Sequence, residues 1–372
     1  MKRMLIVCTA FVCLTFSCTP EKDGGLTLFG NLALPREMHP SLSSLFTPNY
    51  AITPLETTAE CLVGRMDKIK KFRGDYYILS NGRSILRFSN EGKFLASLDR
   101  QGPGPEDYHR IEDFDVYQIE DETEIWVSDN RNLKVYDAAN GTFKHKIAYP
   151  FVIHKFRRLN NAHILLLTGQ SDYSLTLTDE NGNILSEYLK REIPFLMFRP
   201  VQFISHAGGF LYQLGISDSY VSFDPASETF TRGRLSINPS YLSAKRLLDQ
   251  FDRYGMDFIG EANKGSYISN LSVYRDITWA NIRHDAKNYL VKVAPDGVVS
   301  TVFSKDSRIA NDLFGIDESA FISTVTMCES DNSALLYIEA SVVADRESPL
   351  MGKDGNPFHC RQDDNPCILE FF

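Results

Sequence analysis

Alternating apolar and polar positions recur along most of the chain, in short runs that are joined in pairs by tight turns. Alternation of this kind predicts β-strands, and Asn-Gly, Glu-Gly or Asp-Gly between two such runs predicts a hairpin. The clearest copies of this hairpin pattern are SILRFSNEGKFLASL at 84–98, NLKVYDAANGTFKHKI at 132–147, SLTLTDENGNILSEYL at 174–189 and YLVKVAPDGVVSTVF at 289–303. A weaker copy at 220–235 has a longer turn in place of the glycine.

Two further strand-like runs precede each hairpin, so the repeating unit has four strands. The turn glycines Gly92, Gly141 and Gly182 follow one another at intervals of about 40–50 residues, and this period with four strands is typical of a β-propeller. The pattern therefore predicts an all-β, six-bladed β-propeller with four-stranded antiparallel blades. The expected blades lie at about 61–100, 111–148, 151–190, 200–237, 262–304 and from about 320 onward.

The sixth blade is one strand short. CILEFF at 367–372 matches the third strand of the other blades, and no strand follows it. The unassigned extended segment NYAITPLE at 49–56 can supply the outer strand, which would close the ring and remove exposed sheet edges. We therefore expect a strand near the N-terminus to pair with the C-terminal blade.

The first residues have the pattern of a secretory signal. Lys2 and Arg3 precede an apolar run at 4–16, which is too short to span a bilayer. Ser17-Cys18 at its end is similar to a bacterial lipoprotein processing site, which predicts lipidation of Cys18; an ordinary secreted protein is the alternative. The expected division is a signal peptide at 1–17, a tether and linker at 18–46 and one propeller domain at 47–372.

The charge and the cysteines restrict the partners further. The net charge is −9, and loss of Lys2 and Arg3 with the signal leaves 37 basic against 48 acidic residues, a net of −11. Such a surface argues against nucleic acid and against anionic lipid headgroups, so the lipid anchor alone would contact the membrane. The spacing of Cys360 and Cys367 suits a local disulfide. Zinc ligation is the alternative, and we favour the disulfide because no CxxC pair or matched histidine spacing accompanies these cysteines. The pairing of Cys61 and Cys328 stays open.

Three segments carry a family resemblance: ITPLETTAECLVGRMDKI, YYILSNGRSILRFSNEGKFLASL and RQGPGPEDY. Together they resemble the six-bladed β-propeller lipoproteins of Bacteroidota, relatives of NHL-repeat propellers. The resemblance implies this fold and a cell-envelope location, with the outer membrane as the expected one, and it implies no settled activity. The family's glycine-proline signature corresponds here to Gly102, Pro103, Gly104, Pro105, Glu106, Asp107 and Tyr108.

The signature loop connects blades one and two, and two interpretations of it compete. As a corner, Gly102 and Gly104 would supply unusual backbone angles, the prolines would fix φ, and Tyr108 would pack under the turn. As a site, Glu106 and Asp107 would contact a ligand. We favour the corner, because the acidic pair has no evident partner in the sequence.

The strand order predicts that long loops gather on one face, where loops between second and third strands lie beside the blade crossings. The segments 238–261, 276–288 and 342–366 are expected there, and 243–251 reads as a short amphipathic helix covering the gap between blades four and five. Binding residues are often on loops that a rigid scaffold holds, so this face is the predicted site.

The candidate ligand residues combine an aromatic ring with polar and charged groups, which suits a sugar or an acidic peptide. The alternative for Trp279 is that it covers an apolar blade surface. The sequence thus predicts a non-catalytic propeller that binds a glycan, a peptide or an envelope protein, without a cofactor. The candidates are Trp279, Asn281, Arg283 and His284 on one side and Arg361, Asp363 and Asp364 on the other.

An enzyme is the second hypothesis. A metal-dependent hydrolase or lyase could use Glu112, Asp113, His154 and His206 in the central channel. These residues do not recur at matched blade positions, and no metal-ligand spacing or nucleophile motif stands out. Asp129-Asn130-Arg131-Asn132 is interpreted as a turn rather than a calcium loop. No metal site is predicted.

Overall fold

The computed structural model defines most of the chain after its first residues. None of the helices in this part is long and apolar enough to cross a bilayer. The structure describes residues 22–27 and 49–372 except 160–161, 170, 192–202, 207, 214–218, 235–252, 254, 275–276, 294–298, 305–325, 328–332, 345 and 347. The signal segment, Cys18, Cys328 and the helix expected at 243–251 therefore lie outside the described residues.

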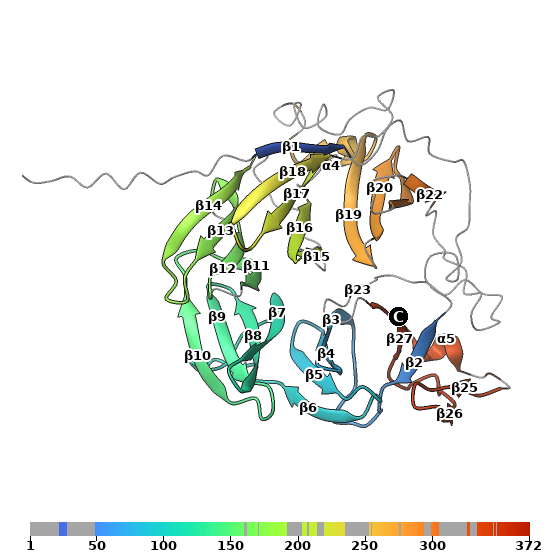
Figure 1. Cartoon of the computed structure of the whole chain (residues 1–372). Helices are drawn as coiled ribbons and strands as arrows, with labels where there is room; N and C mark the ends of the chain where they lie inside the picture. The colour runs from blue at the N-terminus through green and yellow to red at the C-terminus, as the bar shows by residue number, and fades with distance from the viewer. Residues whose placement is uncertain are drawn as a thin grey trace, which may run out of the picture.

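Six four-stranded antiparallel sheets surround a central channel, which confirms the predicted six-bladed β-propeller (Figure 1). The first strand of each blade lies innermost. Blade one comprises β3 (Met66–Phe72), β4 (Asp75–Ser80), β5 (Ser84–Phe88) and β6 (Phe94–Leu98); blade two β7 (Asp113–Ile119), β8 (Glu122–Asp129), β9 (Asn132–Asp137) and β10 (Phe143–Ala148); blade three β11 (Ile153–Arg158), β12 (Ile164–Thr168), β13 (Tyr173–Thr178) and β14 (Ile184–Lys190).

The second half of the ring follows the same order, and its sixth sheet uses strands from both ends of the chain. Blade four comprises β15 (Ile204–His206), β16 (Gly209–Gln213), β17 (Ser219–Asp224) and β18 (Thr229–Arg234); blade five β19 (Ser266–Tyr274), β20 (Ile277–His284), β21 (Lys287–Val293) and β22 (Val299–Ser304); blade six β23 (Thr326–Met327), β24 (Ala334–Ile338), β27 (Cys367–Phe371) and β2 (Tyr50–Pro54).

The core is divided into layers between neighbouring blades. Among the described residues, six clusters of buried side chains lie one at each blade interface, and one of them contains Tyr77 of blade one and Phe114 of blade two. Middle strands are therefore covered on both faces, and all five residues of β12 are buried. This explains why strands such as ILLLT are apolar throughout, although a strand with one wet face would alternate.

The ring closes as the sequence predicts. β2 pairs antiparallel with β27, from Tyr50 opposite Phe371 to Pro54 opposite Cys367, and β27 pairs on its other side with β24. The hairpin glycines also have the predicted conformation: Gly92 has a φ of 82°, and a Cβ there would collide with the carbonyl oxygen of Pro54.

Two features add to the six blades. β1 (Lys22–Thr27) pairs in parallel with β18 as a fifth strand at the outer edge of blade four, inside the segment expected to be a linker. Blade six carries a long insertion at 339–366 between β24 and β27. It contains α5 (Ala340–Val343), β25 (Leu350–Met351) and β26 (Pro357–Phe358), while the 3-10 helix Gly255–Asp257 and α4 (Phe258–Ala262) precede blade five.

The blade-six insertion lies along the outer edge of the ring. Gly352 forms a parallel bridge with Ile52 of β2, and the backbone N–H of Lys353 donates to the Ile52 carbonyl at 2.8 Å. Figure 1 shows α5, β25 and β26 outside the ring, beside β2. The insertion thus covers the edge that β2 would otherwise expose.

Candidate functional site

The predicted loop at 276–288 is wrong: most of this segment is strand. β20 and β21 pair directly and are joined by a two-residue turn, Asp285 and Ala286, with φ values of 46° and 60°. Successive residues of β20 point alternately toward blade six, as Trp279 does, and toward blade four, as Ala280 does. The polar side chains that resembled a loop belong to a strand between two packed interfaces.

Trp279 lies in the core, as in the alternative interpretation. It is 4% exposed and belongs to the cluster between blades five and six, which includes Ile52 and Leu336. The Lys292 ammonium lies 5.4 Å from the centre of its ring. Burial of the indole makes Trp279 a packing residue in this structure.

The other candidates on β20 are divided between the two faces of the strand. Asn281 and Arg283 lie on the same face of β20 as Trp279. His284 lies on the opposite face, where its Nδ1 is 2.6 Å from the Ser266 hydroxyl. Burial lowers the pKa of His284 below its ordinary value.

Arg361, Asp363 and Asp364 occupy a turn on the way to β27. The Arg361 N–H donates to the Asp364 carboxylate at 2.8 Å, and Arg361 and Asp363 are exposed. The predicted ligand residues thus lie on a core strand in one group and in a partly exposed turn in the other.

The glycine-proline loop has the architecture of a corner. Tyr108 is fully buried beneath the turn, where its hydroxyl donates to the Leu98 carbonyl at 2.9 Å and accepts from the Arg100 N–H at 3.0 Å. Contrary to prediction, the acidic pair has a partner: Arg100 lies 3.2 Å from Glu106 and 3.7 Å from Asp107.

The reason for the two glycines also differs from the prediction. Neither Gly102 nor Gly104 has a positive φ. A Cβ at either position would lie 2.6 Å from Asp107 Oδ2, and that carboxylate accepts from the Gly104 N–H at 3.2 Å. Glycine is needed because the Asp107 carboxylate lies against the loop backbone.

The structure brings Cys360 and Cys367 together as two thiols, with 3.4 Å between their sulfur atoms. The contact between them lowers the pKa of Cys360 and raises the pKa of Cys367, and burial adds to the rise at Cys367. The pair is placed where a local crosslink would join the insertion to the first residue of β27.

Asn365 is a structural residue that sequence reasoning missed. It is 3% exposed and its amide donates to the carbonyls of Glu56 and Cys61, at 2.7 and 2.8 Å, while its side-chain oxygen accepts from the Val63 N–H at 2.8 Å. These bonds join blade six to the crossing into blade one. A lone asparagine in a polar turn gives no sequence signal for this role.

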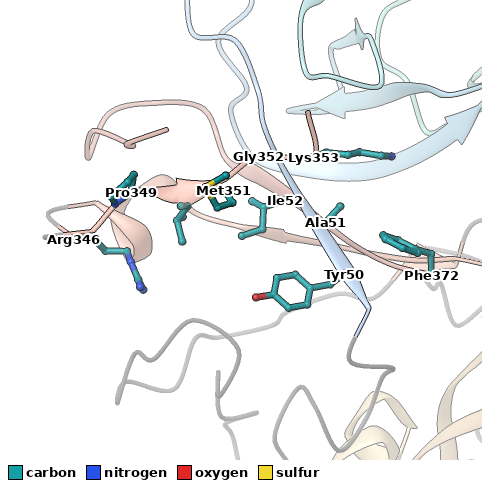
Figure 2. Close-up of a pocket in the computed structure, with 10 residues that line it drawn as sticks. Tyr50, Ala51, Ile52, Arg346, Pro349, Met351, Gly352, Lys353 and Phe372 are labelled. Carbon is teal, nitrogen blue, oxygen red and sulfur yellow. The ribbon is translucent and has the colours of Figure 1, made fainter. Parts of the chain in front are cut away.

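A pocket of about 640 Å³ opens at the outer edge of blade six, between the start of β2 and the insertion. Figure 2 shows Arg346 and Pro349 at one end and Phe372 at the other, with Ala51 and Ile52 of β2 between them. The volume lies within the range of small-ligand sites. The sequence did not predict this pocket, because its two walls are some 300 positions apart in the chain and meet only through ring closure.

The pocket lining combines exposed apolar side chains with a guanidinium. Met351 and Phe372 are 58% and 46% exposed, and Tyr50 adds a second aromatic ring. The Lys353 ammonium donates hydrogen bonds to the Glu370 carboxylate and to the Asn90 side-chain oxygen, each at 2.7 Å. In contrast, the buried Nε of Arg346 has no hydrogen-bond partner among the described residues. A buried N–H donor of this kind favours an anionic acceptor.

The predicted channel residues are arranged differently from a metal site. The Asp113 carboxylate is 2.8 Å from the Lys68 ammonium and 3.4 Å from the Lys155 ammonium. Glu112 lies 3.7 Å from Arg110, and burial lowers the pKa of His154. The described residues contain no group of three potential metal ligands, and the His206 side chain lies outside them. Two lysines beside Asp113 would compete with a metal cation for its carboxylate.

Comparison with known proteins agrees with this architecture. The family model of DUF4934, described as a domain of unknown function, matches residues 36–371. No match was found among curated proteins.

One solved structure shares this fold, and a second gives a weaker match. A Bacteroides fragilis NCTC 9343 protein named "putative exported protein" is similar in structure, with a TM-score of 0.68, 14% identity, and coverage of 90% of this chain and 97% of that one. The extracellular domain of a "putative hybrid two component system" from B. thetaiotaomicron has a TM-score of 0.45 and 10% identity, covering 86% of this chain and 40% of that one. The similarity to the first protein supports the fold.

Proposed function

The chain belongs to the DUF4934 family, and from that premise we propose that it is a non-catalytic binding propeller of the cell envelope. Its ligand is a peptide or glycan that carries a carboxylate, and it binds in the blade-six pocket rather than at Trp279. The single observation that carries the proposal is the buried Nε of Arg346, which has no hydrogen-bond partner among the described residues, beside a pocket of about 640 Å³ that has both polar and apolar lining.

The chemistry of the pocket supports this ligand class. A guanidinium binds a carboxylate through paired N–H donors, and the aromatic and aliphatic surface of Tyr50, Met351 and Phe372 can cover the apolar face of a sugar ring or a side chain. The pocket wall is held by backbone pairing between Gly352 and Ile52. A wall that is ordered before binding loses less entropy when the ligand arrives.

The location is part of the same proposal. The signal-like start and Ser17-Cys18 suit an outer-membrane lipoprotein, and the name of the B. fragilis protein with the same fold suits export. Cys18→Ala is expected to abolish fatty-acid labelling and to release the protein from the membrane fraction. Labelling that persists in this variant would contradict the tether.

The ligand is tested on arrays of peptides and glycans that include carboxylate-bearing members and their amidated or neutral counterparts, probed with the purified full chain. Arg346→Ala should weaken binding of the carboxylate-bearing members by about tenfold or more, the loss expected for one charged hydrogen bond. Arg361→Ala is the matched control, because Arg361 is an exposed arginine of the same insertion.

The two arginine variants distinguish binding in the blade-six pocket from binding at the 361–364 turn. Loss of binding in Arg346→Ala with normal binding in Arg361→Ala supports the pocket. The reverse result would place the ligand at the 361–364 turn, and equal binding of carboxylates and their neutral counterparts would contradict the acidic ligand. Unchanged melting temperatures in both variants would show that neither effect comes from unfolding.

A further inference from the structure

Residues 22–27, inside the segment expected to be a tether, are docked on the propeller. They form β1, which pairs in parallel with β18 of blade four. In the described part of the chain the other blades have four strands each, so blade four is the one whose outer edge gains a fifth strand. Figure 1 shows β1 along the outside of the ring, on the side opposite β6 of blade one.

The strand conformation of this segment comes from its partner rather than from its own sequence. KDGGLT contains two glycines, an aspartate and a lysine, which are residue types depleted in β-strands. The outer edge of a sheet offers a row of backbone N–H and C=O groups, and hydrogen bonds to that edge require no particular side chain. The docking of β1 therefore depends on its backbone donors and acceptors.

The direction of β1 places its first residue at the hairpin end of blade four. β18 begins just after the hairpin turn at 225–228. β1 runs in the same direction as β18, and Lys22 lies opposite Thr231 near the start of that strand. Lys22 is therefore the residue of β1 nearest the hairpin turn, and the chain reaches β1 from that end.

The length of the chain before β1 limits how far blade four can lie from a lipid on Cys18. Lys22 is four residues after Cys18, and four residues of fully extended chain span at most about 14 Å. Without the docking, the limit would be set by the 32 residues from Cys18 to Tyr50 of β2, which span at most about 110 Å. Docking thus shortens the greatest possible distance between anchor and propeller about eightfold.

We propose that β1 orients the propeller at the membrane: it holds the hairpin end of blade four beside the bilayer surface and leaves blade one on the far side of the ring. The partner of this edge is the lipid surface that holds the anchor, so the inference rests on the lipidation of Cys18 included in the proposed function. Zwitterionic headgroups suit this approach better than anionic ones, because the net charge of the chain is −9.

The same orientation bears on the blade-six pocket. Blade six is two blades away from blade four around the ring, so its pocket does not share the edge that faces the bilayer. A ligand could therefore reach the pocket while the propeller stays beside the membrane. The orientation itself does not depend on what the pocket binds.

The first measurement tests the docking, by hydrogen exchange of the backbone amides at 22–25 in the lipidated full chain. Leu26→Pro/Thr27→Pro removes two adjacent backbone donors, one of which points toward β18 because N–H groups alternate along a strand. Leu26→Val/Thr27→Val is the matched control, since it changes the same positions, keeps both N–H groups and favours a strand. The amides should exchange about tenfold or more slowly in the wild type and the control than in the proline variant.

The second measurement tests the orientation, with the lipidated full chain in phosphatidylcholine vesicles. A fluorophore is attached through an introduced azido amino acid at Ala226, in the hairpin turn of blade four, or at Glu91, in the corresponding turn of blade one; both positions are exposed. Lipids with spin-labelled headgroups quench a fluorophore that lies near the bilayer. Quenching should be stronger at Ala226 than at Glu91 in the wild type and the valine control, and the proline variant should lose this difference.

Three results would overturn the orientation: fast exchange of the β1 amides in the wild type, equal quenching at Ala226 and Glu91, or a difference in quenching that persists in the proline variant. Failure of the tether is recognised separately, because a chain without fatty acid on Cys18 would not stay with the vesicles. A labelled chain with equal quenching would contradict the orientation alone. Equal melting temperatures of the proline and valine variants would show that the propeller itself stays folded.

Discussion

Trp279 and its neighbours on β20 are the residues for which the setting most changes the interpretation. In the sequence, an aromatic ring followed by an amide, a guanidinium and an imidazole resembles a binding loop. In the structure the indole fills the interface between blades five and six. The residue types were noticed correctly, but composition does not show that a neighbouring blade covers them.

Trp279→Ala should therefore destabilise the protein. Removal of a buried tryptophan typically costs about 3–5 kcal/mol, and chemical denaturation followed by circular dichroism would measure the loss. Trp279→Phe should cost clearly less, because it retains an aromatic ring. A Trp279→Ala protein with wild-type stability and lost ligand binding would restore this residue to a binding role.

At the scale of elements, the blade-six insertion determines where the candidate pocket lies. Its length predicted an important segment, but its path along the outer edge of β2 depends on backbone pairing with a strand near the other end of the chain. The Asn365 bonds to residues 56–63 depend on the same closure. No local pattern reports either contact.

The cysteine pair gives a prediction for this element. Under oxidising conditions, Cys360 and Cys367 should form a disulfide, because their sulfur atoms are 3.4 Å apart in the structure. The ring is small, so the expected stabilisation is about 2–3 kcal/mol in the loop-entropy model. Intact mass and thiol titration before and after reduction would detect the bond.

Cys360→Ser/Cys367→Ser supplies the control for that measurement. Its stability should match that of the reduced wild type and should not respond to reducing agent. Two free thiols at these positions in protein isolated from an oxidising compartment would contradict the disulfide.

At the scale of the whole molecule, Glu370 joins the last blade to the first. It is 2% exposed, bonds to Lys71 of β3, and accepts from the Tyr76 hydroxyl at 3.1 Å and from Lys353 at 2.7 Å. Burial alone would raise the pKa of Glu370, but the hydrogen bonds and charges of Lys353 and Lys71 lower it below its ordinary value of 4.5. The ring closure therefore contains a carboxylate that must stay ionised.

A lowered pKa in the folded state predicts the direction of the acid response. Glu370 contributes stability that is present above pH 4.5, its ordinary value, and is lost as the pH falls through the lower folded value. The free energy of unfolding, measured by denaturant titration between pH 7 and pH 3, should fall with acid. Glu370→Gln should be less stable at pH 7 and should lose less on acidification; an unchanged slope would contradict this role.

The sequence by itself determined the repeat, the blade boundaries and the closing strand. Each of these depends on local alternation and on turn residues such as Gly92, whose φ of 82° the Glu-Gly turn anticipates. The same local patterns indicated a corner at Tyr108, because glycine, proline and a single aromatic ring act within one short segment.

The tertiary structure decided which surfaces stay open and which charges meet. Closing the ring buried Trp279, brought Tyr50 and Phe372 to one pocket, and aligned Lys68, Asp113 and Lys155 from three separate blades. Partners tens to hundreds of residues apart leave no period in the sequence, since their contact depends on how each blade is rotated against the next. Burial and electrostatics depend on that packing, so the candidate sites followed from the folded molecule.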